Sequence, residues 1–386
     1  MRKDFHEKKE LLRKADGKER MQMKVGVIGA GAISDIYISN MMHRFDGLEV
    51  IAVAAAHPES AKKKADQYGL QACTVDELLA MPEIEMIVNL TPVGRHYELV
   101  HRALEAGKHV YTEKTLADDP AKAAALVAEA KEKGLYLGCA PDTFLGASLQ
   151  TARKAIDGGL IGEVTSFSAT VNRDADVLNS LFYFLHEPGA GVALDYAVYY
   201  VTAIVSLLGP VAETAAYVRT PFPKRANIMP SSPDYGKMMD TPNESILSAM
   251  LRLGSGVTGT IHIDEESVFQ EQVHMVIYGT EGMIFLPKAD YFGGRVKLIR
   301  NRIPDSFTPD EKVEILELPY ANEYHENSRG IGPAEMAAAI REGRESRVDA
   351  GMACHVLDVL DAILRSGREH AFVGVSSTCR IPEAYY

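Results

Sequence analysis

The chain has 386 residues, a length that accommodates two domains, each with its own hydrophobic core. Its formal net charge of -12 argues against binding to nucleic acids or anionic membranes, because both require a basic surface. The cysteines show no Cys-x-x-Cys or Cys/His spacing, so the sequence predicts reduced thiols and no metal site; they are Cys73, Cys139, Cys354 and Cys379.

The amino-terminal residues 1–22 are almost all charged or polar and precede the first predicted strand. They lack the apolar core of a signal peptide, and no run in the chain approaches the roughly 18 apolar residues of a membrane span, so we expect a cytoplasmic protein. Three interpretations of this extension stay open. It is a frayed helical arm, an artefact of start-site choice with Met21 or Met23 as the true beginning, or an arm that packs on a partner subunit.

Residues 23–140 alternate short apolar runs with helical segments, which predicts an α/β Rossmann domain with a doubly wound parallel sheet. The predicted strands are Lys24–Ile28, Leu48–Val53, Met86–Leu90, His109–Thr112 and Leu135–Gly138. The predicted helices are Ile33–Met42, Glu59–Tyr68, Asp76–Ala80, Arg95–Ala106 and Ala121–Lys133.

Residues 141–386 read as an α+β domain with a large open, mainly antiparallel sheet, because consecutive strand patterns are joined by short turns. We expect this domain to bind substrate and to form subunit contacts. The predicted strands are Val164–Val171, Glu213–Val218, Ile246–Leu253, Val257–Ile263, Val273–Tyr278, Val296–Ile299 and Val313–Leu318. The predicted helices are Leu149–Ile156, Val192–Leu208 and Met352–Arg365.

A glycine-rich turn follows the first predicted strand and predicts binding of NAD or NADP. Gly29 stands at the tight turn, and Gly31 stands where the backbone must approach a pyrophosphate at the start of a helix. Ala32 and Ile33 continue this turn, and Ser34 replaces the third glycine of the usual fingerprint. We expect Gly29, Gly31, Ala32 and Ile33 to contact the cofactor.

The residue that usually distinguishes the two cofactors is missing. An acidic residue after the second strand would bind the ribose of NAD, and an arginine would bind the phosphate of NADP. This chain instead has His57, which either contacts the ribose or phosphate or faces solvent. The cofactor is therefore predicted only as NAD or NADP.

Two further segments follow predicted parallel strands, at the edge where open α/β sheets bind their ligands. The first contains Thr91, Pro92 and His96, and the second is Glu113-Lys114. With these segments and the glycine-rich turn, the chain resembles the Gfo/Idh/MocA family of nicotinamide-dependent oxidoreductases. The resemblance implies that all five residues line the cofactor and that Lys114 also takes part in catalysis. It further implies a sugar, inositol or related substrate and a homodimer or homotetramer.

The family's second signature appears as a glycine-rich segment that ends in Asp195, with Tyr199 where many members have histidine. The resemblance implies that both are catalytic, with Tyr199 as acid/base. Oxidation of an alcohol needs a base within hydrogen-bond reach of the hydroxyl, and a neighbouring ammonium favours phenolate, so we expect Lys114 to lower the pKa of Tyr199. The alternatives are a packing tyrosine and a carboxylate that stabilises a helix start.

Four other residues are weaker candidates for substrate binding. Asp142 and Thr143 follow the last predicted strand of the first domain and either contact substrate or cap a helix. Tyr183 and His186 precede the second signature and either border the substrate pocket or pack in the core.

The leading hypothesis is an NAD(P)-dependent oxidoreductase that transfers hydride between the cofactor and a secondary hydroxyl of a sugar, glycoside or polyol. One alternative is a glycoside-cleaving enzyme that uses transient oxidation and elimination. Another is a non-catalytic regulator that binds the cofactor.

Overall fold

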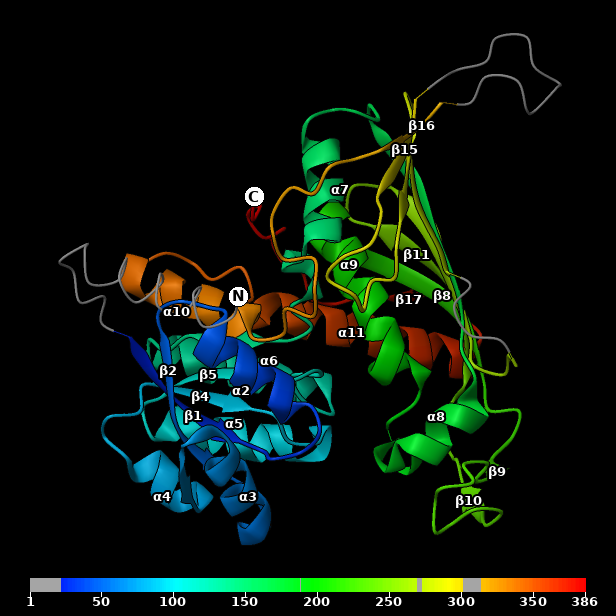
Figure 1. Cartoon of the computed structure of the whole chain (residues 1–386). Helices are drawn as coiled ribbons and strands as arrows, with labels where there is room; N and C mark the ends of the chain where they lie inside the picture. Colours follow the sequence, from blue (N-terminus) through cyan, green and yellow to red (C-terminus); the bar gives the residue numbers. More distant parts are fainter. Residues whose placement is uncertain (1–21, 188, 269–272, 301–313) are drawn as a thin grey trace, which may run out of the picture.

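The computed structural model describes residues 22–187, 189–268, 273–300 and 314–386 (Figure 1). The extension over residues 1–22 lies outside the described residues except for Gln22, as does the first residue of the predicted strand Val313–Leu318. Among the described residues, no helix combines the length and apolar character that crossing a membrane would require.

The first half of the chain forms a parallel sheet between layers of helices, as predicted (Figure 1). The sheet has six strands instead of the five predicted, because the short strand Gln71–Cys73 was missed. The strand order is β3-β2-β1-β4-β5-β6, so β1 and β4 lie side by side. The chain adds β2 and β3 on one side of this pair and β5 and β6 on the other. Such a switch point opens a crevice at the carboxyl ends of the strands. The strands are β1 (Met23–Ile28), β2 (Leu48–Ala54), β3 (Gln71–Cys73), β4 (Met86–Asn89), β5 (His109–Thr112) and β6 (Leu137–Cys139).

Local capping signals set the starts of two helices in this half. The Thr74 side chain accepts a hydrogen bond from the Glu77 N–H, and Glu77 accepts one in return, which completes a capping box. Asp119 caps the following helix by accepting from the N–H groups of Ala121 and Lys122. The helices are α2 (Ser34–His43), α3 (Pro58–Tyr68), α4 (Val75–Ala80), α5 (His96–Glu105) and α6 (Pro120–Glu132).

The second half is built on a nine-stranded sheet, which confirms the large, mainly antiparallel sheet. Within the described residues, β7 pairs with β12 in parallel, and every other neighbouring pair of this sheet is antiparallel. The strands are β7 (Val164–Asn172), β8 (Val211–Arg219), β11 (Ile246–Leu253), β12 (Thr258–Asp264), β13 (Val273–Gly279), β14 (Met283–Leu286), β15 (Lys297–Ile299), β16 (Ile315–Glu317) and β17 (Val373–Gly374). A separate ribbon pairs β9 (Lys224–Ala226) with β10 (Met238–Asp240).

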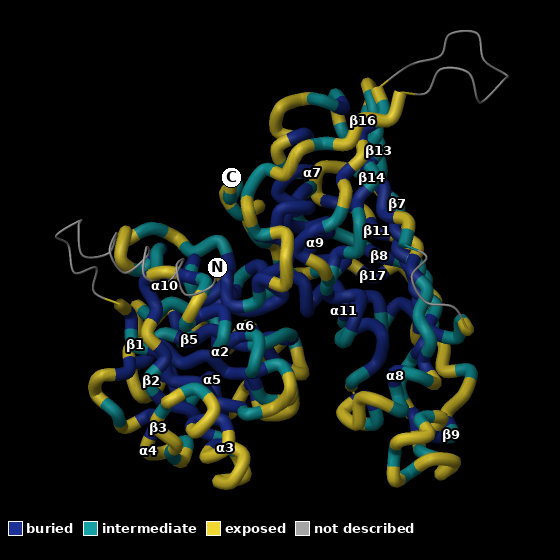
Figure 2. The backbone as a smooth tube through the Cα atoms, in the orientation of Figure 1, coloured by how far each residue is buried: buried dark blue, intermediate teal, exposed yellow. Residues whose placement is uncertain are grey.

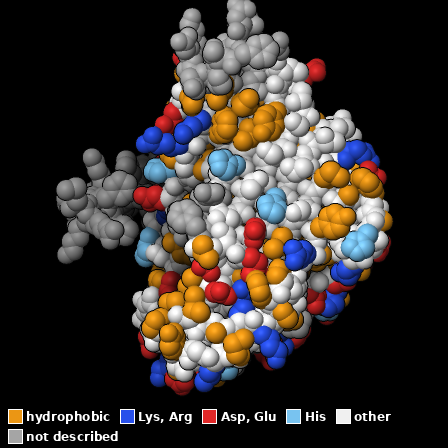
Figure 3. All heavy atoms as spheres, turned by 90° about the vertical axis from the view of Figure 1, so that its right-hand side faces the viewer, with side chains coloured by type: hydrophobic (Ala, Val, Ile, Leu, Met, Phe, Trp, Pro, Cys, Tyr) orange, Lys and Arg blue, Asp and Glu red, His pale blue; other side chains and the backbone are white. Residues whose placement is uncertain are grey.

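Helices cover one face of this large sheet and leave the other open. Helices α7 (Ala147–Asp157), α9 (Val198–Leu208) and α11 (Ala350–Glu369) pack on the covered face, where Figure 2 shows a buried layer. Along β11, buried Leu247 and Ala249 alternate with the more exposed Met250, as expected for a strand with one covered face. Figure 3 looks onto the open face, where polar and small groups surround scattered apolar ones.

Helix α10 (Ile331–Glu342) is not indicated by the sequence patterns, and it returns to the first half of the chain. It lies over the Rossmann sheet next to α2 (Figure 1). The Asn40 side chain donates to the carbonyls of Asn327 and Arg329 at 2.9 and 2.8 Å, and Arg341 donates to the Gly47 carbonyl at 3.0 Å. The segment ahead of α10 is thereby held against α2.

Candidate active site

The glycine-rich turn has the shape and the donors that a dinucleotide pyrophosphate requires. Gly29 has φ +112°, and a Cβ there would lie 2.8 Å from the carbonyl carbon of Leu90, so β1 and β4 approach closely at this point. A Cβ at Gly31 would meet nothing within 4 Å, which leaves open space before α2. The N–H groups of Ala32 and Ile33 have no hydrogen-bond partner among the described residues. The turn therefore fits an incoming anion.

A Gly31→Ala substitution is expected to weaken cofactor binding without changing stability. The methyl group would enter the open space and obstruct the close approach of a pyrophosphate. We expect a Kd for NAD or NADP at least about tenfold higher, equivalent to ~1.4 kcal/mol, in calorimetric titrations. Gly254→Ala is the control, since a Cβ there meets only ordinary contacts in a turn between β11 and β12. An unchanged Kd in the Gly31 variant would contradict this role for the turn.

His57 lies at the same edge of the sheet. It is exposed and directly precedes α3, and its side chain makes no capping hydrogen bond to that helix. The end of β2 is joined to the glycine-rich turn by the Gly29 N–H, which donates to the Ala54 carbonyl at 2.8 Å. The position suits contact with the adenosine side of a cofactor, and exposure to solvent fits equally well.

His96 connects two loops instead of presenting a free ring to the cofactor. Its ring is fully buried, with Nδ1 2.6 Å from the Thr115 carbonyl oxygen and Nε2 2.7 Å from that of Thr91. Thr91 in turn donates to Asn89 Oδ1 at 2.8 Å, and Pro92 precedes a short 3-10 turn. Thr91 and Pro92 thus stand at the crevice, and His96 holds their loop to the loop that carries Lys114.

Glu113 is fixed by hydrogen bonds at the carboxyl end of β5. Tyr37 donates from its hydroxyl to Glu113 Oε1 at 2.7 Å, and the Lys114 N–H donates to Oε2 at 3.0 Å. Both carboxylate oxygens are therefore engaged, and Glu113 lies between α2 and the catalytic candidates.

Lys114 and Asp195 form a largely buried ion pair across the two halves of the chain. The Lys114 ammonium donates to Asp195 Oδ1 at 2.7 Å and to the Asp195 carbonyl oxygen at 2.8 Å, and the two side chains are 17% and 13% exposed. Asp195 lies in a single π-helical turn, Ala193–Ala197, which runs directly into α9. The structure thus brings together two residues that are 81 positions apart in the sequence.

The electrostatics of this pair keep both groups charged. Burial disfavours the ammonium, but Asp195, Tyr199 and Glu113 outweigh it and raise the pKa of Lys114 above its ordinary value. Burial likewise disfavours the carboxylate, but Lys114 and Arg173 outweigh it and lower the pKa of Asp195. Lys114 is therefore a cation at neutral pH and has no lone pair with which to act as a base.

Tyr199 lies beside Lys114, as expected, but its phenol is not ionised by that neighbour. The Lys114 Nζ is 5.6 Å from the centre of the Tyr199 ring. Burial raises the pKa of Tyr199; Lys114 and Arg329 lower it, but they do not outweigh the burial. Lys114 thus lowers the pKa of Tyr199, as expected, but the net pKa stays above its ordinary value. Tyr199 is therefore a neutral phenol at neutral pH.

The structure adds charged residues that sequence reasoning missed. Arg173, at the end of β7, donates to Asp195 Oδ2 at 3.3 Å and to Glu265 Oε1 at 2.7 Å. Burial raises the pKa of Glu265 to about 7 even beside this guanidinium. The charge of Arg329, from the loop before α10, lowers the pKa of Tyr199. None belongs to a recognisable motif, since each arrives from a distant strand or loop.

The structure does not bring the four weaker candidates together in one substrate pocket. Asp142 is 1% exposed and accepts hydrogen bonds from the N–H groups of Gly330 and Gly332 at 3.3 and 3.0 Å. It therefore caps the start of α10. This agrees with the helix-capping alternative for Asp142, although the helix that it caps was not predicted. Thr143 is buried beside it. Tyr183 is 75% exposed, and His186 contacts the carbonyls of Asp240 and Asn179. No hydrogen bond or ring contact within the described residues joins these four to Lys114.

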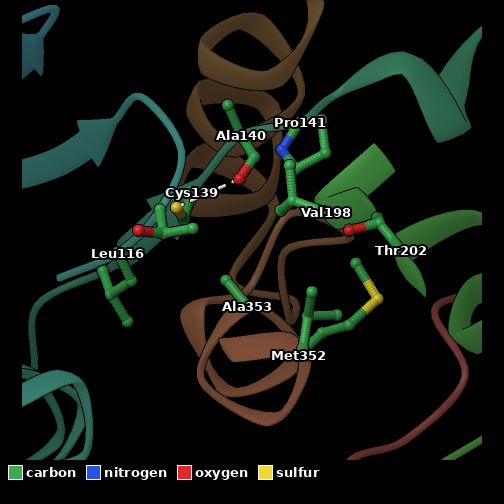
Figure 4. A pocket seen from close by; sticks show the side chains of 10 residues that line it. Leu116, Cys139, Ala140, Pro141, Val198, Thr202, Met352 and Ala353 are labelled. Carbon is green, nitrogen blue, oxygen red and sulfur yellow. Dashed lines mark hydrogen bonds between the residues drawn. The ribbon is translucent and has the colours of Figure 1, made fainter. Parts of the chain in front are cut away.

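A small apolar cavity lies behind the Lys114 loop and is not the substrate site. It has a volume of about 10 Å³, room for about one water molecule. Figure 4 shows Leu116 and Cys139 on one side, and Val198 and Met352 on the other. Val198 directly precedes Tyr199, so the cavity backs the site with apolar side chains.

Comparisons with known proteins agree with this architecture. Residues 23–140 match the model of an oxidoreductase family with an NAD-binding Rossmann fold, GFO_IDH_MocA, and residues 149–285 match the Gfo/Idh/MocA C-terminal domain. An inositol 2-dehydrogenase of Rhizobium meliloti is 30% identical over 39% of this chain and 45% of its own length. A scyllo-inositol 2-dehydrogenase (NADP(+)) of Bacillus subtilis is 23% identical over 90% of this chain and 94% of its own length.

A solved structure shares the fold. The complex of a levoglucosan dehydrogenase with NADH superposes with a TM-score of 0.78 and 21% identity, covering 92% of this chain and 100% of the other. The chain spans about half the length of the Rhizobium relative and nearly all of the Bacillus one. The matched family models together extend over both halves of the chain.

Proposed function

Because this chain belongs to the Gfo/Idh/MocA oxidoreductase family, we propose that it transfers hydride between NAD(P) and a secondary hydroxyl of a sugar, glycoside or polyol. The observation that carries the proposal is the Lys114–Asp195 ion pair with the Tyr199 phenol beside it. This group stands at the loop after β5, at the carboxyl edge of the Rossmann sheet, where such sheets bind their ligands.

Each part of the site has a separate task in this proposal. The turn from Gly29 to Ile33 holds the pyrophosphate, and Thr91 and Pro92 border the nicotinamide side. When bound, the cofactor supplies the acceptor or donor of the hydride. In its phenolate form, Tyr199 takes the hydroxyl proton while the carbon loses hydride and the C–O bond becomes C=O, and the resulting phenol returns that proton in the reverse direction.

Lys114 orients and stabilises the substrate oxygen instead of moving its proton. An ammonium has three N–H donors. Two of them are engaged by Asp195, which leaves one for the substrate oxygen. A fixed cation there favours the charge that develops on an alcohol oxygen as its proton leaves. Arg173 supports the arrangement from behind by binding the second oxygen of Asp195.

We propose the open face of the nine-stranded sheet as the subunit contact of a homodimer or homotetramer, as the family resemblance implies. Within this arrangement, residues 23–140 form the cofactor domain and residues 141–386 the substrate and oligomerisation domain. Light scattering of the purified protein measures the subunit number.

Two measurements test the proposed activity. Mass spectrometry of nucleotide released from the purified protein, with titrations of NAD and NADP, identifies the cofactor. A panel of inositols, sugars and glycosides is then incubated with that cofactor, and we expect reduced nicotinamide to accumulate with at least one polyol or sugar. Glycoside cleavage without net reduction would identify the elimination mechanism instead. Cofactor binding with no turnover across the panel would identify a regulator.

A further inference from the structure

Glu265, the residue after β12, stands at the outer end of a series of ionic contacts that begins in the proposed active site. The Lys114 ammonium donates to Asp195 Oδ1 at 2.7 Å. Arg173 donates to Asp195 Oδ2 at 3.3 Å and to Glu265 Oε1 at 2.7 Å. None of the four side chains is more than 17% exposed. Cations and anions therefore alternate without a break from Lys114 to Glu265.

Arg173 is shared unequally between its two acids. The same nitrogen, Nη1, lies 2.7 Å from Glu265 Oε1 and 3.3 Å from Asp195 Oδ2. Charge-assisted hydrogen bonds are strongest at about 2.7–2.9 Å and weaken as the distance grows. Glu265 therefore takes the stronger bond from this nitrogen. Asp195 is left to bind Lys114, through one side-chain oxygen and through its carbonyl oxygen.

Backbone contacts already join the segments that carry Arg173 and Glu265. Strands β7 and β12 pair in parallel, the Arg173 N–H donates to the Asp264 carbonyl at 2.8 Å, and the Ala175 N–H donates to the Glu265 carbonyl at 2.7 Å. The guanidinium also lies 4.0 Å from the centre of the Tyr196 ring. A buried ion pair adds little net stability, because desolvation of both charges offsets their attraction. The two segments are thus joined without the Glu265 carboxylate, whose effect falls on the Arg173 guanidinium.

We infer that Glu265 is a positioning residue for the proposed reaction: by binding Arg173, it leaves Asp195 to hold the active-site ammonium in place for the substrate oxygen. The inference rests on the proposed function, since its effect on the reaction passes through Lys114. Without the charge of Glu265, the Arg173 guanidinium is neutralised by Asp195 instead. Two cations then compete for one carboxylate, and its hold on Lys114 weakens.

The charged groups that face Glu265 come from three segments of the chain. The end of β7 supplies Arg173, the π turn supplies Asp195, and the segment before β11 supplies Glu244. Glu244 and Glu265 also line a cavity of about 20 Å³, together with Arg225. Burial and the two acids outweigh Arg173 and raise the pKa of Glu265 to about 7. At pH 9 Glu265 is therefore a carboxylate, and removal of its charge is tested there.

Glu265→Gln removes the charge and keeps an oxygen with the same reach. We expect Lys114 to lose its proton more readily in this variant, because the carboxylate that stabilises the ammonium is drawn towards Arg173. Acetic anhydride reacts only with an unprotonated amine, so the acetylation rate of Lys114 should rise about threefold to tenfold at pH 9. Mass spectrometry of peptides from the full-length protein measures this rate for Lys114 alone.

Glu266→Gln is the matched control. Glu266 is the next residue and also pairs with a buried arginine, Arg225, but the other acid on that arginine is Asp176 at 2.7 Å, outside the series of contacts. Acetylation of Lys114 in this variant should equal that in the intact protein. Glu265→Asp keeps the charge with a shorter reach, so its rate should lie between those of the intact protein and Glu265→Gln.

Kinetics provide a second readout in an active preparation. Glu265→Gln should lower kcat about threefold to tenfold at pH 9 with a smaller change in KM, and Glu265→Asp should restore part of the loss. If circular dichroism shows that Glu265→Gln is unfolded, Glu265→Asp carries the comparison with the intact protein and with Glu266→Gln. Acetylation of Lys114 at the intact rate in every folded Glu265 variant would overturn the inference. Acetylation requires no substrate, so that result is distinct from an absence of turnover, which would overturn the proposed function.

Discussion

Replacing Tyr199 with phenylalanine is expected to lower kcat by about 10²- to 10⁴-fold, the range associated with losing a positioned general acid or base. The ring stays in place, since Tyr199 packs against Tyr196 at 6.2 Å between ring centres, and only the hydroxyl is removed. We therefore expect KM and cofactor affinity to change little. Steady-state kinetics with a substrate found in the panel measures the effect.

The pH dependence gives this prediction a second readout. Burial raises the pKa of Tyr199, so the phenol is protonated at neutral pH and the phenolate fraction rises about tenfold per pH unit below that pKa. Oxidation needs the phenolate and should accelerate as pH rises, whereas reduction needs the phenol and should be nearly constant through neutral pH. Tyr199→Phe should remove the slope, and Tyr200→Phe, on the next residue of α9, should retain it. A full slope in Tyr199→Phe would assign the proton to another group.

Replacing Lys114 with methionine is expected to abolish most turnover and also to destabilise the fold. Asp195 would keep Arg173 as a partner but lose its two bonds to the ammonium. Breaking a buried ion pair from one side typically costs about 3–5 kcal/mol. We expect kcat to fall by about 10²- to 10³-fold, as for loss of a group that stabilises developing charge. Urea unfolding and steady-state kinetics measure the two effects.

Lys108→Met separates the two effects, because Lys108 is a buried lysine at the opposite end of the same strand. Its ammonium donates to the carbonyls of Met81 and Ile84, far from the carboxyl edge of the sheet. This variant should lose stability and keep its turnover once folded. If both lysine variants lost turnover in proportion to stability, Lys114 would have only a structural role.

The Rossmann half was predictable because its signals are local. Thr74 and Glu77 bond to each other across three residues, and Asp119 caps the helix that follows it directly. The open space at Gly31 follows from the turn itself. Such contacts depend on neighbours in sequence, so a reading of consecutive residues captures them.

The missed features depend on contacts between distant segments. Helix α10 begins after Gly330 and contains Pro333 in its first turn, a composition that reads as a loop, and its start is capped by Asp142 from 188 residues earlier. Arg173 meets Glu265 only because β7 pairs with β12. Lys114, Asp195 and Tyr199 were found through a family resemblance, whereas Arg329 lies outside the motifs that carried it.

Because Asp195 lies in a π turn, the geometry of the site depends on the number of residues in this helix as well as on their identity. A π turn is an α-helix with one additional residue. Deleting a single residue between Asp195 and Tyr199 would restore the α-helical spacing and rotate one side chain relative to the other by ~100°. A relative can therefore keep the same aspartate, tyrosine and lysine and still lack this arrangement, so alignment gaps in this helix carry as much functional information as substitutions.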